Sequence, residues 1–156
     1  RYELTQKLFA IGNDFGVKDE TGREVMYVDG KKFSFGKKFV LLDNRKREIA
    51  IVKQKVFSFR RTFRVTRDGK FAAAITKKGW GFRQQFLIDI PGTNDYTIVG
   101  DFVGQEYSFK RGSREVARVS KRFFSSTDSY GVDIESGDPI LILCATVVVD
   151  LILHSS

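Results

Sequence analysis

The feature that most constrains the fold is an apolar run near the C-terminus, from Ile140 to Leu153, in which only Thr146 and Asp150 are polar. Asp138 and Pro139 precede it and predict a helix start, because aspartate caps a first turn and proline fits the first helical position. This helix would be about 21 Å long, shorter than the roughly 30 Å hydrocarbon core of a bilayer. A helix that is apolar on every side must be surrounded, so we predict a helix enclosed by a closed sheet. A membrane-inserted tail is the alternative.

Most of the remaining chain alternates apolar and polar residues with a period of two, which is typical of strands with one buried face. Phe63 and Val65, for example, alternate with Arg64 and Thr66. Turn-forming pairs separate these segments, and Asp68-Gly69 is the strongest signal for a two-residue hairpin. About twelve such strands indicate an antiparallel meander, hence a sandwich or a barrel. The enclosed helix favours the barrel.

Composition excludes several classes of chemistry. Hydrophobic residues make up 42% of the 156 residues, which excludes a disordered chain. A single cysteine, Cys144, excludes a disulfide framework and a multi-cysteine zinc site. The single histidine, His154, lies ten residues further along the same predicted helix, too far along its axis to pair with Cys144. We therefore expect no enzyme activity and no cofactor.

The net charge of +8 is concentrated in one part of the sequence. Residues 31–83 carry 17 basic and 3 acidic side chains, whereas the net charge is −2 over residues 1–30 and −4 over residues 84–156. Such asymmetry favours an anionic partner, such as lipid headgroups, nucleic acid or an acidic protein. A basic face that is merely solvated is the alternative interpretation.

Arginine side chains that converge on one face bind phosphate well, because guanidinium donors match phosphate oxygens bidentately. Strand alternation around Phe63 places Arg60 and Arg64 together on the outer face. The candidate lipid- or phosphate-binding residues are Lys31, Lys32, Lys37, Lys38, Arg60 and Arg64. Nucleic acid is disfavoured, because the phenylalanines between these residues are typical of a barrel core and the sequence has no RNP-type string, zinc finger or recognition helix.

Four strings, taken with their order and spacing, resemble the LURP-one-related family, within the superfamily of tubby C-terminal domains and phospholipid scramblases. The strings are Gln6–Gly12, Phe15–Gly22, Tyr96–Phe102 and Asp128–Ile134, followed by the apolar helix ending at Val149-Asp150. The resemblance implies a tubby-like closed antiparallel β-barrel of about twelve strands around a buried hydrophobic C-terminal helix. It implies one domain over residues 1–156, with strands from about residue 2 to 135 and the helix from about 139 to 154.

The resemblance also implies a function. Tubby domains bind phosphoinositide headgroups through basic side chains on the barrel exterior. We therefore expect a non-enzymatic binding domain that associates peripherally with anionic membrane lipid, with a protein-interaction scaffold lacking a lipid ligand as the alternative. We expect an intracellular, cytoplasmic protein without a transmembrane span, and the sequence names no protein partner. Scramblases carry a cysteine-rich stretch that this chain lacks, which argues against scrambling activity.

Carboxylates gather where the last strand leads into the helix, and the scramblase resemblance implies calcium there. The candidate ligands are Asp128, Asp133, Glu135 and Asp138. Their spacing departs from an EF-hand, because Tyr130 stands where an oxygen ligand belongs. The interpretation that we favour makes Asp138 the helix cap and leaves the other three solvated.

Five residues have expected structural roles: Asp138, Pro139, Cys144, Thr146 and Asp150. Cys144 is expected to behave as a small buried apolar residue. A buried Asp150 would need hydrogen-bond donors from the barrel wall, and these would fix the rotation of the helix.

Overall fold

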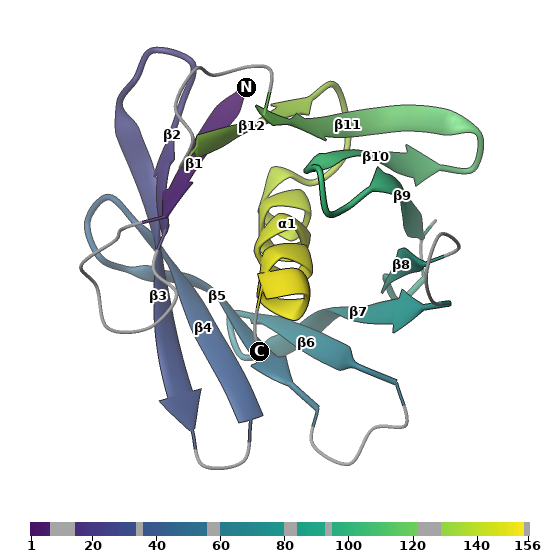
Figure 1. The fold of residues 1–156 in the computed structure, drawn as a ribbon. Helices are drawn as coiled ribbons and strands as arrows, with labels where there is room; N and C mark the ends of the chain where they lie inside the picture. The colour runs from purple at the N-terminus through teal and green to yellow at the C-terminus, as the bar shows by residue number, and fades with distance from the viewer. Residues whose placement is uncertain are drawn as a thin grey trace.

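A closed barrel encircles a single helix in the computed structural model, which describes residues 1–6, 15–33, 36–55, 60–79, 84–92, 95–121 and 129–154. Over these residues the chain forms twelve antiparallel strands and one helix, α1, which lies inside the ring of strands (Figure 1). The predicted tubby-like barrel with an enclosed C-terminal helix is therefore confirmed.

The strands follow one another around the barrel in sequence order, and β1 closes the ring by pairing with β12. Their bounds are β1 Tyr2–Gln6, β2 Phe15–Lys18, β3 Glu24–Phe33, β4 Gly36–Asp43, β5 Glu48–Gln54, β6 Thr62–Arg67, β7 Lys70–Lys78, β8 Gln85–Asp89, β9 Tyr96–Asp101, β10 Glu106–Arg111, β11 Arg114–Ser120 and β12 Ser129–Ile134. The helix α1 spans Pro139–His154.

The hairpin between β6 and β7 shows how turn chemistry sets this order. Arg67 pairs directly with Lys70, so the loop contains only Asp68 and Gly69. Both residues have positive φ, 51° and 74°, as a type I′ turn requires. The hairpin predicted from this dipeptide is confirmed.

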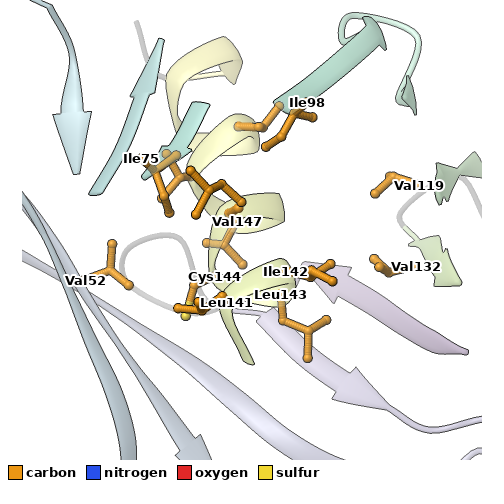
Figure 2. Close-up of a cluster of buried hydrophobic side chains, with 14 of the residues drawn as sticks. Val52, Ile75, Ile98, Val119, Val132, Leu141, Ile142, Leu143, Cys144 and Val147 are labelled. Carbon is orange, nitrogen blue, oxygen red and sulfur yellow. The ribbon is translucent and has the colours of Figure 1, made fainter. Parts of the chain in front are cut away.

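The core lies between the inner faces of the strands and the full circumference of α1. Every helix residue from Leu141 to Val149 is buried. The wall residues around it come from β5, β7, β9, β11 and β12, and each is 0% exposed (Figure 2). They are Val52, Ile75, Ile98, Val119 and Val132.

Strand β6 and the residue before it contact both ends of the helix. Arg61, Phe63, Val65 and Arg67 alternate along this segment, so the two buried apolar residues lie between two arginines. The Nη1 atom of Arg67 lies 2.7 Å from a carboxylate oxygen of Asp138 at the start of α1. Arg61 Nη1 donates to the carbonyl oxygen of Ile152, 3.4 Å away, near the end of α1. An arginine at the carbonyl end and a carboxylate at the amide end both complement the helix dipole.

Both arginines can reach the helix because the distance between them matches the length of the helix. Arg61 and Arg67 are six residues apart in an extended segment, which spans roughly 20 Å at 3.3 Å per residue. Asp138 and Ile152 are fourteen residues apart across the helix, which spans about 21 Å at 1.5 Å per residue. One extended segment therefore fixes the position of the helix along the barrel axis.

The enclosed helix makes Val148 a sensitive position, since its side chain is 0% exposed. We expect Val148→Asp to abolish cooperative folding, because an unpaired buried charge costs several kcal/mol of a typical domain's stability. Val148→Ala should lower the free energy of unfolding by about 1–3 kcal/mol, because it leaves a cavity without a charge. Thermal and urea unfolding measure both effects.

Val103 provides the matched control, because its side chain is 73% exposed. Val103→Asp should change stability by no more than about 0.5 kcal/mol. A Val148→Asp protein that unfolds cooperatively at the wild-type midpoint would contradict the enclosed position of the helix.

Candidate functional site

Basic residues pair with one another across four consecutive strands, β3 to β6. Lys38 on β4 pairs with Lys31 on β3 and with Lys53 on β5, and Lys53 pairs in turn with Arg64 on β6. We call these four residues the basic row. Phe39 and Val52, which adjoin Lys38 and Lys53, and both neighbours of Arg64 are buried in the core, so alternation directs Lys38, Lys53 and Arg64 to the barrel exterior.

Two charges of the basic row have no ion-pair partner within the described part of the chain. Like charges directly opposite each other on neighbouring strands are destabilising. Lys53 and Arg64 are these two residues, since neither forms an ion pair with another described residue. Both side chains are exposed, whereas Lys38 is half-buried. Lys53 and Arg64 therefore place positive charge on an accessible surface and favour an anion in front of it.

The six predicted binding residues divide into three groups. Lys31, Lys38 and Arg64 belong to the basic row. Lys32 and Lys37 pair with each other one position further along β3 and β4. Arg60 is exposed and precedes β6, so both predicted outer arginines are accessible.

Lys53 is the member that the sequence prediction omitted from the site. Its place between Lys38 and Arg64 depends on the register of two hairpins, and one of them contains a bulge between Leu41 and Leu42. Alternation in the sequence could show that Lys53 faces outward, but not which residues stand beside it.

The carboxylates proposed for calcium lie in different surroundings. Asp133 is exposed, with its Oδ2 atom 3.7 Å from Arg1 Nη2. Glu135 is exposed, and Asp138 forms part of the helix cap; Asp128 lies outside the described residues. In the described segments, no three Asp, Glu, His or Cys side chains are grouped in a way that could hold a metal ion. The calcium site stays a prediction.

Asp138 is the centre of a hydrogen-bond network at the start of α1. Its Oδ1 atom accepts from the backbone N–H groups of Ile140 and Leu141, at 3.0 and 3.4 Å. Its Oδ2 atom pairs with Arg67, and its own backbone N–H donates to Tyr96 Oη at 3.1 Å. That hydroxyl also accepts from Arg111 Nη2 at 2.6 Å. The carboxylate thus satisfies helix amides that would otherwise lack partners.

Gly137 is needed beside this network. Its φ of +99° is unfavourable for other residues, and a Cβ atom there would lie 2.7 Å from Tyr96 Oη. Glycine therefore lets the chain pass Tyr96 closely before it enters the helix.

Two polar residues of α1 have hydrogen-bond partners in the structure. Thr146 is fully buried, and its hydroxyl donates to Ile142 O in the same helix at 2.8 Å. Asp150 is half-buried and accepts from Gln105 Nε2 at 3.3 Å. Gln105 lies in the turn between β9 and β10, so the end of the barrel supplies one donor to Asp150. Cys144 is 1% exposed, and Pro139 is exposed at the first helical position.

Burial keeps three ionisable groups of the core neutral. Burial raises the pKa of the Cys144 thiol from the usual 9.0 to about 12. Burial, together with the nearby charge of Asp150, raises the pKa of Tyr107 and of Tyr130 above the usual value. The Tyr130 hydroxyl has no hydrogen-bond partner among the described residues.

These shifts predict that the protein loses stability in alkali. Above about pH 9 the unfolded chain ionises its thiol, and above about pH 10 its tyrosines, while the folded core keeps these protons. The unfolded state then binds fewer protons than the folded state, so stability falls as pH rises. Each group contributes up to roughly 1.4 kcal/mol per pH unit between its unfolded and folded pKa values. Urea unfolding between pH 7 and pH 11 measures this slope.

Tyr130→Phe provides the control, because it removes one titrating group whose hydroxyl makes no described hydrogen bond. It should leave stability at pH 7 unchanged or slightly higher and make the decline above pH 10 shallower. A wild-type stability that stays constant from pH 8 to pH 11 would show that these groups titrate normally.

A second prediction distinguishes the contribution of the helix cap at Asp138 to stability from that of its ion pair with Arg67. Asp138→Asn keeps an oxygen for the helix amides but loses the charge that faces Arg67, whereas Asp138→Ala loses both. We expect Asp138→Ala to cost about 1–2 kcal/mol and Asp138→Asn clearly less. Asp133→Ala, at an exposed neighbouring carboxylate, should change little. If millimolar calcium raises the melting temperature and Asp138→Asn removes that rise, the metal hypothesis replaces this account.

Comparison with known proteins agrees with the strand order and the enclosed helix. A model of the family described as LURP-one-related matches residues 1–150. The chain belongs to the LURP-one-related family. This confirms the resemblance seen in the sequence.

Two similar proteins cover nearly the whole chain. YxjI of Bacillus subtilis (strain 168) is 28% identical over 153 residues, which are 97% of this chain and 93% of YxjI. The X-ray structure of a protein from Arabidopsis thaliana matches with a TM-score of 0.72, at 13% identity over 98% of this chain and 91% of that one. The second likeness shows the shared fold. Across the described residues, no helix is long and apolar enough to cross a membrane.

Proposed function

We propose that this barrel is a non-enzymatic binding domain that associates peripherally with anionic membrane lipid through the basic row. The register of β3 to β6 carries the proposal, because it sets Lys38, Lys53 and Arg64 directly opposite one another. An arrangement that destabilises the sheet by like-charge repulsion is explained if an anionic surface neutralises it.

The expected strength follows from the number of charges. A basic residue near an anionic membrane contributes about 1 kcal/mol. The basic row together with Arg60 would contribute on the order of 4–5 kcal/mol, which corresponds to roughly millimolar binding. Association through these charges is therefore weak, reversible and sensitive to salt. Arg64 could add preference for phosphoinositide-like headgroups, because its guanidinium can bind phosphate oxygens in pairs.

The environment of Cys144 supports a binding role over a catalytic one. The nucleophilic form of cysteine is the thiolate, and a raised pKa keeps this buried thiol protonated near neutral pH. The chain has no other cysteine.

Vesicle co-sedimentation tests the proposal with a charge-reversed variant. Wild-type protein should bind phosphatidylcholine vesicles that contain phosphatidylserine or a phosphoinositide, and should release them as salt rises. Lys53→Glu combined with Arg64→Glu should lower the partition coefficient about ten-fold or more.

Arg114→Glu combined with Arg118→Glu is the matched control. Both arginines are exposed on β11, which the strand order places across the barrel from β5 and β6, and the change in net charge is the same. We expect it to reduce binding no more than about three-fold. Equal losses in the two variants would mean that net charge matters and the basic row does not. Equal binding to neutral and anionic vesicles by the wild type would remove the lipid proposal.

A groove on β3 and β4 favours a second candidate, a protein-interaction scaffold without a lipid ligand. The groove has a volume of about 630 Å³ and combines apolar and acidic side chains. It is lined by Glu24, Met26, Tyr27, Asp29, Leu42, Asp43, Asn44 and Lys46. This candidate becomes the leading one if anionic vesicles leave the protein in the supernatant.

A further inference from the structure

We propose that Phe71 inserts into the anionic bilayer as an apolar anchor, held beside the basic row by Arg64. This inference rests on the proposed membrane association and adds an apolar contact to it. Phe71 lies near the start of β7, next to the β6–β7 turn.

Phe71 is exceptional among the described phenylalanines because of its exposure. Its side chain is 42% exposed, whereas Phe15, Phe39, Phe63, Phe86, Phe102 and Phe109 are each at most 2% exposed. Among the large hydrophobic residues of the described segments, only Phe71 and Val103 are exposed. A single exposed apolar residue needs no explanation by itself. The surroundings of Phe71 distinguish it from Val103.

Arg64 lies over the ring of Phe71. Its Cζ atom is 4.6 Å from the ring centroid, a distance at which a guanidinium is attracted to an aromatic face. This contact places the ring on the outer face of the barrel, directly beside the last member of the basic row. One side chain therefore links a headgroup-binding charge to an exposed aromatic ring.

A second row of paired residues without charge begins at Phe71. Phe71 pairs with Thr66, Thr66 with Ile51 and Ile51 with Val40, from β7 back to β4. This uncharged row lies two residues along the strands from the basic row, or about 6.6 Å at 3.3 Å per residue. Val40 is 7% exposed and Ile51 is half-buried, so Phe71 is the most exposed apolar member of the row.

The two rows match the chemistry of a bilayer surface. One row is charged, and the uncharged row beside it ends in an aromatic ring. Cations meet the phosphate layer, and an aromatic side chain is favourable just below it. The exposed charges of Lys53 and Arg64 favour an anionic bilayer as the occupant of this face. Phe71 would add a contact that salt does not screen, since apolar burial does not depend on ionic strength in the way that charge does.

The test measures binding to phosphatidylcholine vesicles containing 30 mol% phosphatidylserine, by co-sedimentation, over a range of salt concentrations. Phe71→Ala should lower the partition coefficient about five- to ten-fold at every salt concentration and leave the salt dependence unchanged. Phe71→Leu should restore most of the binding, because it restores an apolar side chain. Arg64→Lys keeps the charge but loses the planar contact, so it should weaken binding less than Phe71→Ala does.

Val103→Ala is the control, because this exposed residue lies in the turn between β9 and β10 and away from the basic row. It should bind as the wild type does. Phe71→Thr, which keeps a β-branched residue in the strand, replaces the alanine variant if that variant has a lower melting temperature.

The outcomes distinguish failure of the Phe71 anchor from failure of the proposed membrane association. If wild-type protein does not bind anionic vesicles, the proposed function itself fails. If wild-type protein binds and Phe71→Ala and Phe71→Thr bind equally well, the membrane association stands and the anchor is wrong. A loss in Phe71→Ala that appears only as a shallower salt dependence would also overturn the anchor, because Phe71 would then act through the charge of Arg64.

Discussion

The whole structure depends on the mutual enclosure of one apolar helix and one closed sheet. A barrel of this strand number is too wide for its own inward side chains to fill, and a helix apolar around its circumference cannot face water. Each therefore removes the other's exposed apolar surface, from Leu141 to Val149 on the helix side. The contacts of Arg67 and Arg61 with the two ends of α1 then fix how far the helix enters.

Because the helix occupies the barrel interior, the outer face of the strands and the turns at the barrel ends are the surfaces available to a partner. Closure supports this arrangement, since a closed sheet has no edge strand that must be protected from pairing with another chain. The outer positions need not be apolar, whereas the inner positions must be apolar to pack against the helix. Between β4 and β6 these positions hold Lys38, Lys53 and Arg64 in one row and Val40, Ile51 and Thr66 in the next.

The sequence was sufficient for the fold, because its decisive features are local. Asp138-Pro139 before an apolar run predicts the helix, and Asp68-Gly69 predicts its hairpin, without knowledge of any distant contact. Prediction of the basic row requires information that is not local in the sequence. Lys38 faces Lys53 because Asp43 Oδ1 accepts from the backbone N–H groups of Arg45 and Arg47, which shapes the turn, and because a bulge shifts the register by one residue. Alternation alone could not supply that register.

The arrangement of the outer face has an energetic consequence for the inner one. Like charges in register weaken the pairing of β4, β5 and β6, and an exposed phenylalanine adds apolar surface in contact with water. The same strands carry Val52, Phe63 and Val65 on their inner faces, each 0% exposed. Burial of such side chains contributes about 1.5–3 kcal/mol each, which exceeds the roughly 0.2–1 kcal/mol scale of a cross-strand pair. The inner face can therefore hold these strands together while the outer face carries charges that the sheet itself does not favour.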